Sequence, residues 1–109
     1  MSCVFCKIIA REIPSDIVFE DEHAIAFNDI NPLAPVHVLV VPKRHYASLD
    51  ELPGNDIESA GNLLLTIKEV AAKLNVSGGY KVVTNCGEAA GQVVPHLHFH
   101  ILAGKKFVP

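Results

Sequence analysis

Features of two large functional classes are missing from this sequence. No apolar run approaches the ~20 residues that a membrane-spanning helix needs, and the longest, such as residues 36–42, is far shorter. Lys and Arg together number nine against twelve Asp and Glu, and they are scattered along the chain. We therefore expect no membrane span and no nucleic-acid partner.

The paired cysteines of a disulfide-stabilised domain are also missing. The chain has three cysteines, Cys3, Cys6 and Cys86, and this odd number comes without a basic-then-apolar signal segment at the N-terminus. Disulfide frameworks are typical of secreted domains with even sets of cysteines. We interpret Cys86 as an ordinary buried thiol, the other two as thiols or thiolate ligands, and expect a cytoplasmic protein.

Internal repeats, low-complexity tracts and linkers are absent as well. Pro and Gly stand as punctuation between patterned segments rather than in long runs. With 109 residues, half of them hydrophobic, the sequence predicts a single domain over residues 1–109. A core of this size leaves room for stabilisation by a metal or a partner subunit.

The hydrophobic pattern predicts an α+β domain, with a five-stranded antiparallel sheet, one long helix and one short helix. The expected strands cover residues 17–20, 24–27, 37–41, 80–85 and 96–102. The short helix is expected near residues 5–9, and the long one between Asp56 and Leu74. The long helix is indicated by apolar residues at spacings of three and four: Ile57, Ala60, Leu63, Leu64, Ile67, Val70, Ala71 and Leu74.

The last expected strand carries three histidines at alternate positions. Because side chains alternate across a strand, His96, His98 and His100 are expected on one face, with Leu97 and Phe99 toward the core. An ordinary polar strand face and a metal site are two interpretations. Neighbouring histidines, ~6.6 Å apart along the strand, can share an ion, whereas the outer pair is ~13 Å apart. At most two of them would share one metal.

A third interpretation is chemistry at phosphorus. A neutral imidazole can attack phosphorus and form a covalent intermediate, which divides one difficult displacement into two easier ones. The unperturbed histidine pKa of ~6.5 leaves a neutral fraction at cellular pH. Neighbouring imidazoles can donate hydrogen bonds to the phosphate.

The run from His96 to Leu102 matches the His-x-His-x-His-x-x signature of the histidine-triad (HIT) superfamily, and nearly the whole chain resembles its Hint-type branch. The other matching positions are Phe5, Lys7–Ile9, Glu12–Pro14, Phe19–Asp21, Ala26–Phe27, Asp29–Ile30, Pro32, Ala34–Pro35, His37, Pro42–Lys43, His45, Asn85 and Gly91–Gln92. The resemblance implies a HIT-like fold whose sheet extends across a homodimer. It also implies a nucleoside phosphoramidate hydrolase that acts on adenylate or guanylate conjugates through a nucleotidyl-histidine intermediate.

The resemblance also implies the catalytic roles. The middle histidine, His98, is expected to be the nucleophile, while His100 and His37 hydrogen-bond the phosphate and order the imidazole. From its position alone, His37 also fits an ordinary polar residue at the start of a strand. The phosphate-binding loop, where fixed donors stabilise developing charge, is expected to comprise Asn85, Gln92, Val93 and Val94.

A nucleoside pocket is implied around Asp29, whose carboxylate suits the two vicinal hydroxyl groups of a ribose. Without the resemblance, Asp29 would be interpreted as a turn residue before Pro32. The other residues expected to contact the nucleoside are Phe5, Ile8, Ile13, Phe27, Asn28 and Ile30. The apolar members of this set fit an ordinary core equally well.

Val93 departs from the family pattern. Many Hint-type relatives have a serine or another polar residue at this position, which helps to protonate the leaving group. Valine has no proton to donate, and general acid catalysis commonly contributes ~10²- to 10⁴-fold. We expect slower turnover, or protonation by His100, water or the substrate itself.

Cys3 and Cys6 form a Cys-x-x-Cys pair, whose spacing lets two thiolates share a zinc ion. The chain resembles bacterial histidine-triad proteins with this pair, in which the remaining ligands correspond to His45 and His96. Two thiolates and two imidazoles complete a tetrahedral shell, which is typical of structural zinc. A reduced, metal-free pair is the alternative.

Two other functions stay open at this point. One is hydrolysis of dinucleoside polyphosphates, although the short tail of residues 105–109 resembles the Hint type better. The other is a regulatory or scaffold protein that binds nucleotide without turnover. The complete histidine triad argues against that second function.

Overall fold

The structure is a computed structural model that describes residues 3–109. Its elements are α1 (Val4–Ile9), β1 (Ile17–Glu20), β2 (Ala24–Asn28), β3 (Val36–Pro42), the 3₁₀ helix η1 (Leu49–Glu51), α2 (Ile57–Lys73), β4 (Tyr80–Val83), the 3₁₀ helix η2 (Glu88–Ala90) and β5 (Phe99–Ala103). The five strands form one antiparallel sheet in the order β1-β2-β3-β5-β4. The predicted α+β class is confirmed.

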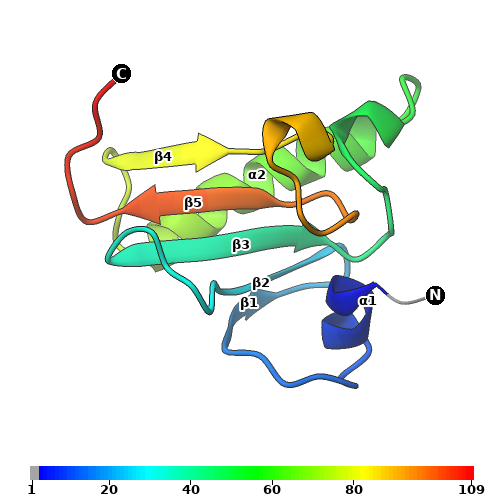
Figure 1. The fold of residues 1–109 in the computed structure, drawn as a ribbon, viewed down its shortest axis with the longest axis horizontal. Coiled ribbons are helices and arrows are strands. Elements are labelled where there is room, and N and C mark those ends of the chain that lie inside the picture. Colours follow the sequence, from blue (N-terminus) through cyan, green and yellow to red (C-terminus); the bar gives the residue numbers. More distant parts are fainter. Residues whose placement is uncertain (1–2) are drawn as a thin grey trace.

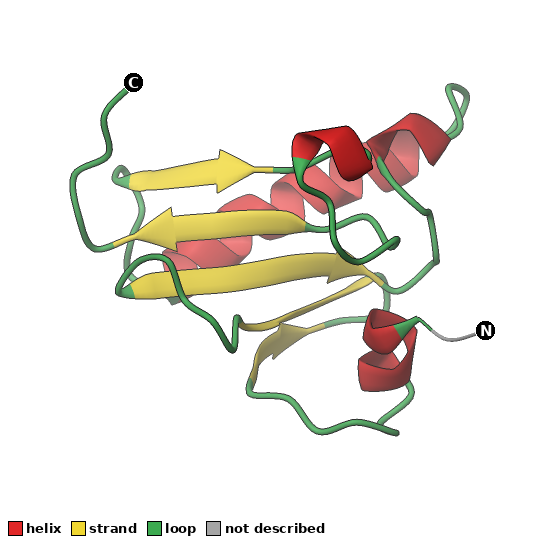
Figure 2. Cartoon of the chain, in the orientation of Figure 1, coloured by secondary structure: helices red, strands yellow, loops and turns green. Residues whose placement is uncertain are grey.

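Helices cover the two faces of the sheet unequally. The long helix α2 lies behind the sheet in Figure 1, while α1 and the loops that follow β2 and β4 lie on the near side (Figure 2). Alternation along β3 explains the two cores, because Val38 and Val40 pack toward α2 whereas Leu39 and Val41 pack with α1. The near face carries the polar groups described below.

The helix α2 begins at a cap and buries one narrow face. The Asp56 carboxylate accepts a hydrogen bond from the Ser59 backbone N–H at 3.1 Å, which satisfies one of the free donors at the helix start. Leu63, Ile67 and Val70 are buried against the sheet. The helix predicted between Asp56 and Leu74 is confirmed, although two residues of its apolar stripe lie at the surface, Ile57 with 80% and Leu64 with 62% exposure.

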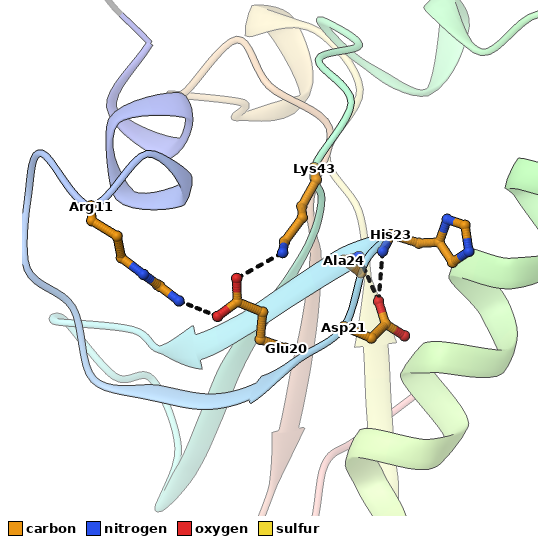
Figure 3. A network of polar contacts seen from close by, with 6 residues as sticks. All are labelled: Arg11, Glu20, Asp21, His23, Ala24 and Lys43. Atoms are coloured by element: carbon orange, nitrogen blue, oxygen red, sulfur yellow. Dashed lines mark hydrogen bonds and ion pairs between the residues drawn. The ribbon is translucent and has the colours of Figure 1, made fainter.

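The turn between β1 and β2 is held by one carboxylate. Asp21 accepts hydrogen bonds from the backbone N–H groups of His23 and Ala24, both at 2.8 Å (Figure 3). The Glu20 carboxylate beside it binds Arg11 and Lys43, the latter at 2.7 Å, and these bonds lower the pKa of Glu20, with Lys43 making the largest contribution. Glu20 therefore joins the segment after α1 to the end of β3.

The histidine segment departs from the prediction of one continuous strand over residues 96–102. The strand β5 begins only at Phe99, so His96 and His98 precede it. Their backbone bonds lie outside the sheet ladder: Leu97 N–H donates to the Tyr46 carbonyl, and the His98 carbonyl accepts from the Thr84 hydroxyl, both at 2.7 Å. The strand predicted for residues 80–85 likewise ends at Val83.

Within the described part of the chain, no helix is long and apolar enough to span a membrane.

Candidate active site and metal centre

A cavity of about 580 Å³ opens on the α1 side of the sheet. It collects most of the nucleotide-site residues expected from the sequence: Phe5, Ile8, Ile13, Phe27, Asn28, Asp29, Ile30, His37, Asn85, Val93, Val94, His98 and His100. The predicted site residue Gln92 does not line it. Leu33, which the sequence did not suggest, does.

The buried imidazole of His98 forms part of the inner wall of this cavity. Its Nδ1 atom lies 2.7 Å from the main-chain carbonyl oxygen of His96, and the residue as a whole is only 7% exposed. A carbonyl oxygen only accepts hydrogen bonds, so Nδ1 carries the proton and Nε2 keeps its lone pair. The ring also packs edge-on against Phe5, with centroids 5.0 Å apart. The tautomer with its proton on Nδ1 and a lone pair on Nε2 is the one that a nucleophilic imidazole requires.

A second chain of hydrogen bonds orients His37 and His100. The backbone N–H of Leu33 donates to Nδ1 of His37 at 3.0 Å, so a neutral His37 carries its proton on Nε2. That Nε2 lies 2.8 Å from Nδ1 of His100 and donates to it. The remaining proton of His100 therefore lies on its Nε2 atom, as a donor for a bound ligand.

Burial keeps His100 neutral. Desolvation, the largest cause, acts together with the neighbouring His98 and His37 to lower the pKa of His100 to about 4, while Asp29 acts in the opposite direction. At neutral pH both of its ring nitrogens thus keep the roles that the hydrogen bonds define. A neutral donor does not require a counter-ion beside it.

The Asp29 carboxylate has one oxygen in a turn and one near the histidines. Oδ1 accepts from the Asn31 backbone N–H at 2.8 Å, while Oδ2 lies 3.4 Å from Nε2 of His37. The turn role considered from the sequence is therefore present. It coexists with a place on the cavity wall, where Oδ2 can accept a further hydrogen bond from a ligand.

Asn85 and Gln92 play different parts in the loop that carries η2. Asn85 lines the cavity and donates from Nδ2 to the Ala90 carbonyl at 2.9 Å. The Gln92 amide lies outside, where Nε2 donates to the carbonyls of Ala47 and Val94 at 2.7 and 2.9 Å and Oε1 accepts from Gly87 N–H at 2.8 Å. The expectation that Gln92 faces the phosphate is thus corrected to a loop-fixing position, because its amide is used by the backbone.

Three apolar residues at the cavity mouth are largely exposed. Ile30 is 90% exposed, Leu33 72% and Val93 89%. Ile30 was expected to enclose a base, but in this structure it lies at the rim. Phe5, Ile8 and Phe27 are buried instead and form the enclosed apolar end with the partly buried Ile13.

A separate cluster joins Cys3, Cys6, His45 and His96. Nδ1 of His96 lies 3.3 Å from the Cys3 sulfur and 3.6 Å from the Cys6 sulfur, and Nδ1 of His45 lies 3.2 Å from the Cys6 sulfur. Zinc bonds of ordinary length at the tetrahedral angle place sulfur and nitrogen ligands about 3.5 Å apart. The four side chains therefore fit a tetrahedral zinc ion.

The protonation of His96 also suits a metal ligand. Its Nε2 atom lies 2.9 Å from the Pro42 carbonyl, so the proton is there and Nδ1 presents a lone pair to the sulfurs. Burial lowers the pKa of His96 and raises that of Cys6. The imidazole is thus in its ligand form, and a cation in the cluster would favour the thiolates.

The grouping of possible ligand atoms also answers a question left open by the sequence, which is whether all three triad histidines could bind one metal. Within residues 3–109, His96 belongs to the cysteine cluster, whereas His100 lies with Asp29 and His37. A single metal held by all three histidines of the triad is therefore contradicted. Cys86, interpreted as a buried thiol, is half-buried and lies outside both groups.

The fold and the histidine-lined cavity together define a histidine-triad protein. Residues 10–107 match the family model of the HIT domain, and the chain belongs to the HIT family. A HIT-like protein of Synechococcus elongatus is 50% identical over 102 residues, which cover 94% of this chain and 90% of that protein.

Solved structures agree closely with this fold. A HIT family hydrolase from Clostridium thermocellum has a TM-score of 0.93 at 49% identity, covering 99% of this chain and 95% of its own. A histidine triad nucleotide-binding protein from Candida albicans has a TM-score of 0.80 at 40% identity, with coverage of 92% and 73%.

Proposed function

We propose that the protein is a nucleotide hydrolase that cleaves nucleoside 5′-phosphoramidates or related adenylate and guanylate conjugates. The observation that carries this proposal is the His98 imidazole, whose Nδ1 proton is bound by the His96 carbonyl at 2.7 Å in the wall of the cavity. Its Nε2 lone pair is then free to attack phosphorus. The names of the Clostridium thermocellum and Candida albicans proteins, a hydrolase and a nucleotide-binding protein, support it.

In the proposed reaction, Nε2 of His98 forms a bond to the α-phosphorus while the bond from phosphorus to the leaving nitrogen breaks. The departing amine takes the electron pair of that bond and a proton from water or from the substrate itself. A water molecule then attacks the phosphorus and releases a proton to the solvent, His98 departs with the electron pair of its own bond, and the nucleoside monophosphate is released. During both steps, the His100 N–H and the Asn85 amide are positioned to bind phosphoryl oxygens.

The proposed ligand of the cavity is a purine nucleotide with a single phosphate. Phe5 and Phe27 pack with ring centroids 5.5 Å apart and supply an apolar surface for a base, and Asp29 supplies an acceptor for ribose hydroxyls. No Lys or Arg is among the described residues that line the cavity. Polyphosphate chains are usually bound by such cations or by metal ions, so a dinucleoside polyphosphate is the less favoured substrate.

Zinc is proposed as a structural cofactor of the same chain. Cys3 also caps α1, where its sulfur lies 3.4 Å from the Cys6 backbone N–H, so ligation would fasten this helix to the end of β3. When bound, the ion would supply folding energy rather than a reaction centre, because four protein ligands leave no open coordination position.

A homodimer is also proposed. The strand β4 is at an edge of the sheet, and its Val82 is 41% exposed on the side that α2 covers. On α2, Leu64 and Leu65 are 62% and 64% exposed. A second copy that pairs with β4 would extend the sheet and cover these side chains.

Turnover of a fluorogenic adenosine 5′-phosphoramidate tests the proposed function. His98→Ala is expected to lower kcat/KM by more than about 10³-fold, while His23→Ala, at an exposed imidazole outside the cavity, serves as the matched control. Nucleotide binding without turnover by the unaltered protein would favour the scaffold alternative. Equal rates for the unaltered protein and His98→Ala would contradict the catalytic assignment.

A further inference from the structure

We propose that Leu33 and Val93 form an apolar subsite for the leaving group, so that the preferred substrates carry an alkyl or aryl amine on the α-phosphorus. This inference rests on the proposed phosphoramidate hydrolysis and specifies its substrate class. Leu33 is 72% exposed and Val93 is 89% exposed, yet both line the cavity that contains His98 and His100.

The direction of the reaction places the leaving group at the cavity mouth. In-line displacement at phosphorus sends the leaving group away from the attacking atom. His98 is 7% exposed and belongs to the inner wall, so the opposite direction leads toward the open side. The nucleoside cannot also occupy that side if its base lies against the buried rings of Phe5 and Phe27.

Leu33 is fixed at the histidine end of the cavity. Its backbone N–H donates to Nδ1 of His37 at 3.0 Å, and His37 in turn contacts His100 at 2.8 Å. The backbone of Leu33 is therefore held in place by the histidines that are proposed to bind the phosphate. Val93 is in the loop that also places Asn85 and Gly91 on the cavity wall.

The charges around the mouth favour an uncharged leaving group. Among the described residues that line the cavity, those exposed at the surface carry no charge. Asp29 is the one acidic residue among the described residues of the lining, and its side chain is only 18% exposed. A leaving group with a carboxylate or phosphate would find no cation here, whereas an alkyl chain would remove apolar surface from water.

Isolated exposed apolar residues are common on protein surfaces and need no explanation. The difference here is position, because Leu33 and Val93 border the same opening as the catalytic histidines.

A homologous series of substrates tests the subsite. Adenosine 5′-phosphoramidates of n-alkylamines from methyl to hexyl differ in contact area while the basicity of the amine stays nearly constant. We expect kcat/KM to rise roughly two- to fourfold for each added methylene until the chain passes the rim. Terminal carboxylate or ammonium groups on chains of equal length are expected to abolish the gain.

Variants locate the effect. Leu33→Gln and Val93→Thr are expected to flatten the dependence of kcat/KM on chain length, because both replace apolar contact with polar surface at similar size. Ile57→Gln is the matched control, since Ile57 is 80% exposed at the start of α2 and lies outside the cavity. It is expected to retain the full dependence.

The outcomes separate this inference from the proposed function. A flat series, a preference for charged chains, or full chain-length dependence in both cavity variants would overturn the apolar subsite while phosphoramidase activity stands. If these substitutions leave specificity unchanged but alter the sedimentation coefficient, the two residues contact a second copy, which also overturns it. Absence of turnover for every phosphoramidate would instead contradict the proposed function.

Discussion

The Nδ1 atom of His98 lies 2.7 Å from the carbonyl oxygen of His96, whose own Nδ1 faces the sulfurs of Cys3 and Cys6. One residue thus belongs to the proposed zinc site through its side chain and orients the proposed nucleophile through its backbone. The zinc cluster and the active site share this single peptide unit. Disturbing either one is therefore expected to affect the other.

Loss of zinc is expected to lower activity as well as stability. Cys3→Ser should lose the metal from a protein that otherwise carries about one zinc per chain, and should reduce the melting temperature. Because the His96 carbonyl then loses its fixed position, kcat is expected to fall about 10- to 100-fold, with a smaller change in KM. Metal analysis, thermal unfolding and steady-state kinetics measure the three effects.

Cys86→Ser is the matched control, since Cys86 is outside the cluster. Full metal content in Cys3→Ser, or metal-free native protein after gentle purification, would refute the zinc assignment. Unchanged kcat in a metal-depleted, folded variant would refute the coupling through His96.

His37 is expected to act through the proton that it donates to His100. His37→Ala removes that donor and should lower kcat, whereas His37→Gln keeps an amide N–H that can reach Nδ1 of His100 and should recover part of the loss. The contact to be replaced spans 2.8 Å. Equal kcat values for both variants, with both proteins folded, would show that His37 does not fix the tautomer of His100.

Stability is expected to depend on pH through His100. Its pKa is about 4 in the folded chain and near 6.5 in the unfolded chain, so the unfolded state binds more protons between these values. The stabilising contribution is complete above pH 6.5 and is lost as the pH falls toward 4. At about 1.4 kcal/mol per pH unit, and reduced for partial exposure, it amounts to about 1–3 kcal/mol.

Urea unfolding of the unaltered protein and of His100→Asn between pH 4 and 7 measures this contribution. The difference in unfolding free energy between the two proteins should shrink as the pH falls, since His100→Asn has no group to titrate there. Acid release of zinc affects both proteins alike and cancels in the difference. A difference that is independent of pH would show that His100 titrates normally.

Val93→Thr is expected to change the sensitivity of the rate to the basicity of the leaving group. Threonine has nearly the same shape as valine and adds a hydroxyl that can donate a proton. For strongly basic amines, kcat should rise about tenfold or more, while for leaving groups that depart without a proton it should change little. The same factor for both classes would indicate an effect on binding or folding instead of protonation.

Much of the fold follows from local pattern, and the departures arise from distant backbone partners. The spacing of Leu63, Ile67 and Val70 predicts α2 because burial on one helix face repeats every three to four residues. No local pattern reveals that the Tyr46 carbonyl binds Leu97 N–H at 2.7 Å and draws the histidine segment out of the ladder before Phe99. The alternating pattern of residues 96–102 therefore predicts the burial of Leu97 correctly, but it places the start of β5 too early.

The candidate site shows the same division. The family motif predicts the cavity histidines and the cysteine cluster, and the structure brings each group together. It does not predict that the Gln92 amide is bound by the Ala47 carbonyl, 45 residues away in sequence. Leu33 carries no motif at all, and only its exposure on the cavity wall marks it.

We propose that His98 becomes covalently bonded to the nucleotide during turnover. Rapid mixing of protein with adenosine 5′-phosphoramidate, alkaline quenching within the first turnover and peptide mass spectrometry test this claim directly. We expect one adenylyl group on the peptide that contains His98, and no adduct in His98→Ala. An adduct on another residue, or stoichiometric release of adenosine monophosphate in the first turnover without any adduct, would contradict it.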